Sequence, residues 1–352
     1  MRALWPQLSP WIDGGESFAL ATVTAVSGSA PRLPGSCMAI APESLRFLGS
    51  VSSGCLDVEV VEAARAALVS GHPQMLRFGP DGQPPWTDGL TCGGWIAVRV
   101  EPWWGSHPRV EARAIVPHLR GWLERDEPAV VLSRDDCHLA VSPDGAAFGD
   151  SSAFTSEEIQ TALAHLSAEL PPGMFGPEAE AVFIRTIRRR PRLIIVGATD
   201  VAIRLVPCAR EAGFATVVID PRAPYADPSR FPTPPDRLAR IWPQGILHEL
   251  RPGPRDVAVV VTHDPKIDDA ALLALLRTRA GYVGAMGSTR SHAHRLERLR
   301  GQGATEADLA RIHGPAGIHL ATPDAAGIAV GILAGILQWQ AGDERRRASA
   351  AH

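Results

Sequence analysis

The sequence predicts an α/β protein in which an N-terminal mixed α+β domain precedes a C-terminal domain with a doubly wound parallel sheet. The chain of 352 residues is too long for one ordinary hydrophobic core. A Pro/Gly-rich stretch at 171–180 interrupts it near the middle, and beyond it continuous apolar runs alternate with helical segments, as in a parallel sheet covered on both faces. We therefore expect domains at 1–187 and 188–341, followed by a charged tail at 342–352 that is frayed or disordered.

The first half has the pattern of a mixed sheet with short helices. Residues 57–71 carry apolar side chains at helical spacing, and acidic residues load the first turns, as a helix N-terminus prefers. A second helix is expected at 111–127, where Pro117 predicts either a late start or a kink, and a third at 153–170. Strand-like runs occur at 18–26, 37–41, 74–79, 95–101, 129–133 and 181–187.

The second half opens with the pattern of a Rossmann unit. Residues 193–222 read as a strand, a glycine turn, a helix and a second strand that ends at Asp220. Gly197 is expected to form the tight turn, and Asp220 follows it by 23 positions, near the usual distance for a residue that holds a ribose hydroxyl. Thr199 and Ala202, however, replace the second and third glycines, so the pattern favours the fold over dinucleotide binding.

Strands at 256–262 and 281–287 and helices at 267–280 and 290–303 continue this alternation. The apolar stretch at 327–339 is shorter than the ~20 residues that span a bilayer. We therefore expect a buried or interface helix there, and no membrane span.

Composition excludes several classes of function. The net charge of -3 provides no basic excess for nucleic acid. Lys266 is the only lysine, which rules out a phosphate loop of the Walker type. The N-terminus lacks the uninterrupted apolar segment of a signal peptide, so we expect a cytoplasmic protein.

Five widely spaced cysteines without a CxxC pair, at 37, 55, 92, 137 and 208, argue against a disulfide framework or a structural zinc site. Any free cysteine can simply be a small buried hydrophobe. Cys55 and Cys92 differ from the others because each lies in a glycine-bearing turn, beside Gly54 and Gly93 respectively. Glycine lets a ligand approach the sulfur closely, and nearby helix-start N–H groups stabilise a thiolate.

Two further candidate segments follow strands of the second half. His263 and Asp264 stand at the carboxyl end of an apolar strand, where open α/β sheets place their ligand crevice. Asp264 could equally be the N-cap of the next helix. Ser288 and Arg290, at the start of the helix after the next strand, are typical of an anion site.

Taken in order, the segments resemble the XdhC/CoxI family of accessory proteins for molybdenum hydroxylases. The matching blocks cover most of the chain and are "SGSAPRLPGSCMAI", "GSVSSGCLDVEVVEAA", "LTCGG", "LIIVGATDVA", "VVVTHD", "GAMGSTRSHAHRLERL" and "LARIHGPAGI". The resemblance implies an N-terminal domain joined to a Rossmann-like domain, often as a homodimer. It also implies a maturation factor rather than a turnover enzyme.

The implied role is to bind and protect the molybdenum cofactor, as molybdopterin or its cytidine dinucleotide form. A cysteine desulfurase sulfurates the cofactor, which then passes to an apo hydroxylase of the xanthine dehydrogenase or carbon monoxide dehydrogenase type. Cys55 and Cys92 match the two motif cysteines, which are implied to contact molybdenum or relay sulfur. The positions implied to hold the pterin phosphate or a nucleotide extension are Arg32, His263, Asp264, Ser288 and Arg290.

Four departures from the family pattern stand out. Ser53 replaces a glycine and Asp57 a glutamate around Cys55, and Gly327 replaces an acidic residue. The pair Thr199–Asp200 replaces Gly-His, which weakens the case for a pyrophosphate at that turn. Two other hypotheses stay open. One is an NAD(P)-dependent oxidoreductase using the Rossmann unit and His263; the other is a structural protein that docks desulfurase and hydroxylase.

Overall fold

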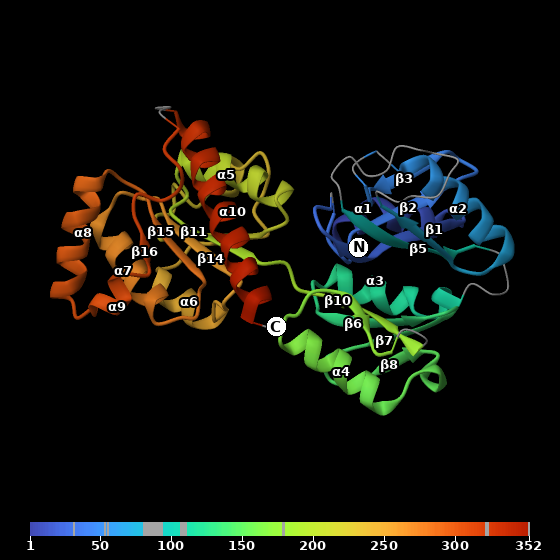
Figure 1. The fold of residues 1–352 in the computed structure, drawn as a ribbon. Helices are drawn as coiled ribbons and strands as arrows, with labels where there is room; N and C mark the ends of the chain where they lie inside the picture. Colours follow the sequence, from blue (N-terminus) through green and yellow to red (C-terminus); the bar gives the residue numbers. More distant parts are fainter. Residues whose placement is uncertain are drawn as a thin grey trace. The chain divides into compact units, whose positions relative to one another are not determined.

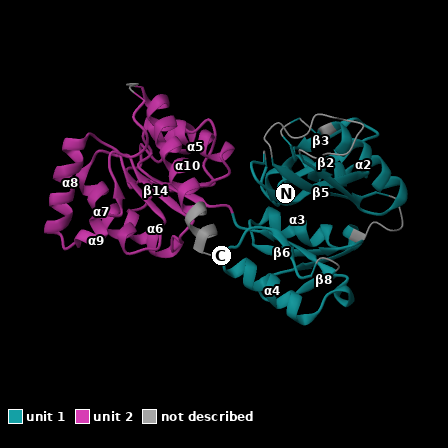
Figure 2. Cartoon of the chain, viewed as in Figure 1, with its two compact units in different colours: residues 1–189 teal, residues 190–352 magenta. Residues whose placement is uncertain are grey.

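The fold is described by a computed structural model covering residues 1–352 except 31, 53, 55, 80–93, 106–110, 178–179, 321–323 and 351–352. The chain forms two compact units, Met1–Arg189 and Arg190–His352 (Figure 2). Each unit has its own sheets and hydrophobic cores. The predicted α/β fold class is confirmed.

The first unit contains two five-stranded sheets, and every strand pairing described in them is antiparallel. The order of the first sheet is β3 (Arg46–Gly49), β2 (Cys37–Ala41), β1 (Phe18–Ser27), β5 (Trp95–Trp104), β4 (Gln74–Phe78). The order of the second is β8 (Ala147–Gly149), β7 (Cys137–Val141), β6 (Ala129–Arg134), β10 (Val182–Ile187), β9 (Gly173–Phe175). The expected α+β character is therefore confirmed, but the expectation of a mixed sheet is wrong. Most of the paired strands are neighbours in sequence and form hairpins, which are antiparallel, and the central pairs β1–β5 and β6–β10 are antiparallel as well.

Alternation along the strands divides the first unit into layers. In β1, Phe18 and Leu20 face a core shared by both sheets, whereas Ala19 and Ala21 face a separate core under α2 (Asp57–Ser70). The shared core also takes side chains from α1 (Trp5–Asp13) and α3 (Val116–Glu124). The outer face of the second sheet is covered by α4 (Ser156–Ser167) (Figure 1).

The three helices predicted for this unit are present, and the structure adds a fourth, α1. A short 3-10 turn (Glu111–Ala114) precedes α3, which has Pro117 in its first turn, so Pro117 delays the helix and does not kink it. The helix α1, with prolines at positions 6 and 10, was not anticipated from the sequence.

The second unit has one six-stranded sheet, and all its described pairings are parallel, as predicted. The strand order is β13 (Arg237–Ala239), β12 (Ala215–Ile219), β11 (Arg192–Val196), β14 (Val257–Val260), β15 (Tyr282–Ala285), β16 (Ile312–His313). The chain starts at β11, builds outward to β13 and then returns to β14 on the other side of β11. The carboxyl ends of β11 and β14 therefore flank the topological switch point, where such sheets bind ligands.

Helices cover both faces of this sheet (Figure 1). One face carries α5 (Asp200–Glu211) and α10 (Ala325–Ala350), which pack against each other. The other face carries α6 (Pro243–Leu250), α7 (Pro265–Leu276), α8 (Thr289–Gly301) and the short α9 (Glu306–Leu309).

The helix α10 contains the apolar stretch predicted at 327–339. Residues Ala325–Asp343 are long and apolar enough to cross a membrane by length and composition alone. Ala329, Ile332 and Ile336 of this helix are buried in the core beside α5. The helix continues to Ala350 and so includes most of the charged tail.

Candidate functional site

Two loops of the first unit and the start of one strand meet at one edge of its first sheet. β1 is antiparallel to β2, which is antiparallel to β3, so β1 and β3 end at the same edge. β5 starts at that edge, because Ser27 at the end of β1 pairs with Trp95. The loops that follow β1 and β3 thus share one end of the sheet with Gly94, the described residue that precedes β5. Arg32 and Gly54 are the predicted site residues described at this end.

The loop after β1, residues 28–36, carries Arg32, whose side chain is exposed. Gly35 closes the loop with a φ of +87°, and its N–H donates to the carbonyl of Val23 at 2.8 Å. A Cβ at this position would lie 2.6 Å from Cγ of Pro172, so only glycine fits. The loop is therefore held at its base while Arg32 stays free to meet an anion.

Gly94, the described residue before β5, packs directly on this loop. A Cβ on Gly94 would lie 2.3 Å from the carbonyl oxygen of Ser29 and 2.5 Å from that of Ser27. The backbone at Gly94 thus touches the backbone of the Arg32 loop. Cys92 and Gly93, which precede Gly94, lie outside the described residues.

The segment between β3 and α2 forms the third part of this edge. Ser52 is fully buried, and its hydroxyl accepts a hydrogen bond from the Leu56 N–H at 2.9 Å. Leu56 belongs to the same apolar cluster as Ala30 of the first loop. Gly54 is exposed, with a φ of +108° and open space where a side chain would lie. Cys55 lies outside the described residues.

A layer of buried polar side chains lies between the two sheets of this unit. Nε of Arg99 donates to Glu101 at 2.7 Å, and the indole N–H of Trp103 donates to the same carboxylate at 3.1 Å. From the second sheet, Nε2 of His138 lies 3.6 Å from Glu101, and Nη2 of Arg185 donates to the hydroxyl of Thr22 in β1 at 2.6 Å. These contacts tie β1 and β5 to β7 and β10, and so fix the strands that carry the motif loops.

The charges in this layer shift its titrating groups. Burial by itself raises the pKa of Glu101, but the charges of Arg99 and His138 and the hydrogen bonds from Trp103 and Arg99 outweigh it and hold the pKa at about 2. Burial lowers the pKa of His138. Glu101 is therefore ionised at neutral pH and compensates the buried Arg99.

In the second unit, Gly197 and Thr262 form the switch point. Gly197 follows β11 with a φ of +111°, and a Cβ there would lie 2.6 Å from Cγ2 of Thr262, just after β14. The glycine turn predicted from the sequence is present. It serves close packing of two strand ends, which requires the absence of a side chain.

Asp220 is buried at the end of β12 and is already engaged. Its carboxylate accepts hydrogen bonds from the Ala198 N–H at 2.9 Å and from Nη2 of Arg222 at 2.8 Å. Burial raises the pKa of Asp220, but the hydrogen bonds from Arg222 and Ala198 outweigh it, so the pKa is lowered. Arg222 in turn lies over the ring of Tyr225, 3.9 Å from its centre. Asp220 therefore braces the turn after β11.

The start of α5 is also engaged by a neighbouring cation. Nη1 of Arg230 donates to the carbonyl of Ala198 at 2.7 Å, and Nη2 lies 3.3 Å from the carboxylate of Asp200. The hydroxyl of Thr199, the N-cap, is buried and has no hydrogen-bond partner among the described residues.

His263 and Asp264 follow β14 as predicted. His263 is exposed and has a φ of +64°, which is rare for a residue other than glycine and is frequent at functional sites. Asp264 accepts a hydrogen bond from the Lys266 N–H at 3.0 Å and is the N-cap of α7, so its capping role is confirmed.

Ser288 and Arg290 lie at the adjacent start of α8. The hydroxyl of Ser288 accepts from the Ser291 N–H at 3.1 Å, and Arg290 is exposed. Behind this turn lies Arg295, only 4% exposed, which donates to the Met286 carbonyl at 2.8 Å and approaches Asp268 to 3.8 Å. Sequence reasoning missed Arg295; its position seven residues after the N-cap, on the inward face, is the signal that could have indicated it.

The predicted residues therefore fall into two groups. Arg32 and Gly54 belong to the edge of the first unit, and Gly197, Asp220, His263, Asp264, Ser288 and Arg290 belong to the carboxyl edge of the parallel sheet. Across the described part of the chain, no group of three or more His, Cys, Asp or Glu side chains could hold a metal ion.

Two family models match these two regions. The model of the XdhC and CoxI family matches residues 11–79, and the model of the XdhC Rossmann domain matches residues 193–336. The chain belongs to the XdhC and CoxI family. In this XdhC/CoxI protein, the region matched by the first model includes Arg32 and Gly54. The region matched by the second includes the predicted residues at the carboxyl edge of the parallel sheet.

Relatives of this XdhC/CoxI protein match nearly its full length. It is 27% identical to a probable xanthine dehydrogenase subunit of Bacillus subtilis (strain 168) over 334 residues, 94% of this chain and 96% of the relative. It is 24% identical to the "Molybdenum cofactor insertion chaperone PaoD" of Escherichia coli (strain K12) over 321 residues, 91% of this chain and 82% of the relative.

A solved structure shares the fold of this XdhC/CoxI protein. A crystal structure described as a xanthine dehydrogenase from Bacillus halodurans superposes with a TM-score of 0.76 and 22% sequence identity. The match covers 96% of this chain and 95% of the other. The two-unit fold is thus known from an experimental structure.

Proposed function

We propose that this protein is a molybdenum cofactor chaperone that matures a molybdenum hydroxylase. Membership of the XdhC and CoxI family and likeness to a molybdenum cofactor insertion chaperone over 91% of the chain support a maturation role. The observation that carries the proposal is that the loops after β1 and β3, with exposed Arg32 and Gly54, meet at one sheet edge beside the start of β5. Such an edge offers a bound cofactor a hydrogen-bond donor at Arg32 and close approach to the backbone at Gly54.

In the first unit, Cys55 and Cys92 would contact molybdenum or relay sulfur to it. A soft thiolate is a favourable contact for the metal, and the flanking Gly54 and Gly93 let the cargo approach. Arg32 would pair with an anionic group of the pterin. A complete coordination cage would hinder release, so we propose few contacts to the metal.

In the second unit, Ser288 and Arg290 would hold a phosphate at the start of α8, with His263 and Asp264 on the adjacent loop. Free N–H groups at a helix start favour an anion, and an exposed guanidinium can add a charged hydrogen bond. The cofactor bound in this way would be molybdopterin or its cytidine dinucleotide form.

The proposed partners follow from this role. A cysteine desulfurase would supply the terminal sulfur, and an apo hydroxylase of the xanthine dehydrogenase or carbon monoxide dehydrogenase type would receive the cofactor. We further propose that the protein acts in the cytoplasm as a homodimer.

The test is binding of purified molybdenum cofactor to the full-length protein, measured by co-elution in gel filtration under anaerobic conditions. The wild type should retain the cofactor, and the double variant Cys55→Ala, Cys92→Ala should lose most of it. The matched control is Cys208→Ala, a half-buried cysteine of α5. Absence of binding by the wild type, or equal retention by the double variant, would refute the proposed site.

A further inference from the structure

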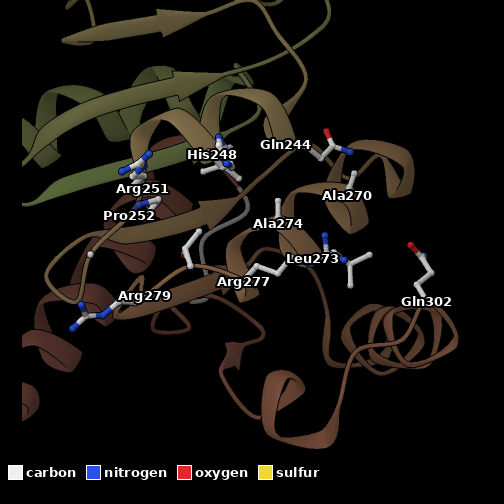
Figure 3. Close-up of a pocket in the computed structure, with 13 residues that line it drawn as sticks. Gln244, His248, Arg251, Pro252, Ala270, Leu273, Ala274, Arg277, Arg279 and Gln302 are labelled. Atoms are coloured by element: carbon white, nitrogen blue, oxygen red, sulfur yellow. The ribbon is translucent and has the colours of Figure 1, made fainter.

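A hollow of about 880 Å³ lies in the second unit away from the residues discussed so far (Figure 3). It opens between α6 and α7 and is bordered by the loops that enter β14 and β15. These loops lie at the amino ends of the parallel strands, so the hollow is at the edge of the sheet opposite His263 and Ser288. Its floor is formed by Leu247, Ala270, Leu273 and Ala274.

The rim of the hollow is strongly basic. Arg251, Arg277 and Arg279 are exposed and line it together with His248. None of the described residues that line the hollow is acidic, and none of these three arginines forms an ion pair with a described side chain. In a chain with a net charge of -3, this is a local concentration of uncompensated positive charge.

Backbone hydrogen bonds hold the main chain of the three arginines in place. Arg251 ends α6 in the left-handed conformation, and its N–H donates to the Leu247 carbonyl at 3.1 Å. Arg277 ends α7, and the N–H of Arg279 donates to the Pro252 carbonyl at 3.2 Å, which joins the two entering loops. The backbone of the rim therefore needs little rearrangement on binding, and only the exposed side chains have to adjust.

The arginines do not converge on one point. In Figure 3, Arg251 and Arg279 lie at one end of the hollow without pointing toward each other, and Gln302 lies at the other end. A small anion would be held by convergent donors, whereas an extended ligand can meet apolar residues along the floor and guanidinium groups at separate points of the rim.

We propose that this hollow docks an amphipathic, acidic segment of a partner protein. Apolar side chains of the segment lie on the leucine and alanine floor, and its carboxylates pair with Arg251, Arg277 and Arg279, whose planar forks suit carboxylates. The charges steer the encounter and fix the direction of the segment. This docking function uses none of the residues proposed to contact the cofactor.

The test uses a fluorescein-labelled amphipathic peptide of about 18 residues, or five helical turns, with leucines on one face and glutamates on the other. Fluorescence anisotropy with the full-length protein at low salt should show binding at least about tenfold tighter than for the same peptide with lysines in place of the glutamates. Arg277→Glu should weaken the binding of the acidic peptide about tenfold, and added NaCl should weaken this binding further. Arg204→Glu, an exposed residue of α5 outside the hollow, is the matched control and should bind like the wild type.

Several outcomes would overturn the proposal. These are equal binding of the acidic and lysine peptides, unchanged binding by Arg277→Glu, or an equal loss in Arg204→Glu. Should Arg277→Glu, at the C-cap of α7, have a lowered melting temperature, Arg279→Glu, two residues beyond it, takes its place with the same expected loss. Tighter binding of a fluorescein-labelled oligothymidylate than of the acidic peptide would assign the hollow to nucleic acid instead. Since no cofactor is present, a negative result leaves the chaperone proposal intact.

Discussion

At the scale of single residues, Asp220 shows how one carboxylate can match a binding pattern and yet brace the fold. Its position relative to Gly197 suits a ribose-binding acid, but its oxygens accept from Ala198 and Arg222. Arg230 donates a hydrogen bond to the Ala198 carbonyl in the same turn. An NAD(P)-dependent oxidoreductase would need this turn open to a pyrophosphate, so the contacts favour the cofactor chaperone over that alternative.

Asp220→Asn tests this interpretation. Loss of the charge weakens hydrogen bonds to a charged partner, so we expect a lower free energy of unfolding by about 1–3 kcal/mol in urea titrations. NADH fluorescence should show no saturable quenching in either the wild type or the variant. The control Asp200→Asn changes an exposed carboxylate with one 3.3 Å contact and should shift stability little. Saturable quenching that Asp220→Asn weakens would instead support the oxidoreductase.

At the scale of elements, the polar layer decides how the two sheets of the first unit fit together. Glu101 is 2% exposed and lies between Arg99 on its own strand and His138 of the facing sheet. Arg185, 3% exposed, reaches across to Thr22. Removal of one partner from such a buried network leaves an uncompensated charge and destabilises strongly.

The pH dependence of stability follows from Glu101. Its pKa of about 2 in the folded protein is below the ordinary value of 4.5. The carboxylate therefore stabilises the fold above pH 4.5, and this contribution, on the order of 3 kcal/mol, is lost as the pH falls from 4.5 through 2. Glu101→Gln should be less stable than the wild type at neutral pH and should lose less further stability on acidification.

Thermal unfolding followed by circular dichroism between pH 7 and pH 2 measures this difference. The control is Glu124→Gln, an exposed residue of α3 paired with Arg120, which should keep the wild-type pH profile. Parallel profiles for Glu101→Gln and the wild type would show that Glu101 does not carry the acid sensitivity.

How much the sequence predicted is also clearest at this scale. The strands β1, β11 and β14 and the helix α2 were predicted within two residues of their observed bounds. The apolar residues of α2 are regularly spaced, and those of β11 and β14 are uninterrupted. The strands β3, β8, β9, β13 and β16 and the helix α6 were missed, since they are short and lack the uninterrupted apolar run that marks β11 and β14. The alternation of polar and apolar residues in β5 correctly assigns Arg99 and Glu101 to one face and Val98 and Val100 to the other. Taken alone, it would place the polar side chains in solvent. Only the second sheet, which no local pattern reveals, buries them.

The candidate site was predictable in part for similar reasons. Glycine turns and helix starts mark positions such as Gly197, Asp264 and Ser288, because their backbone requirements are local. Arg222, Arg230 and Arg295 were not indicated, since their roles depend on which strand ends lie side by side.

At the scale of the whole molecule, each of the two units has separate cores. We therefore expect residues 190–352 to fold when expressed alone. This fragment should unfold cooperatively in urea, with a midpoint close to that of one transition of the full chain. A fragment without cooperative unfolding would mean that the second unit depends on the first. The fragment 196–352, which lacks most of β11, is the control and should not fold.

In the second unit, only the length of one short strand separates the basic hollow from the loop that carries His263. The basic hollow borders the entry to β14, and His263 follows its exit, while β14 itself has four residues and a length of about 13 Å. A rigid strand of this length joins both surfaces in one body. If a ligand at one end alters the affinity at the other, thermodynamic reciprocity requires the same factor in both directions. A docked partner that loosens the hold on an anion would then itself be released more readily when that anion returns.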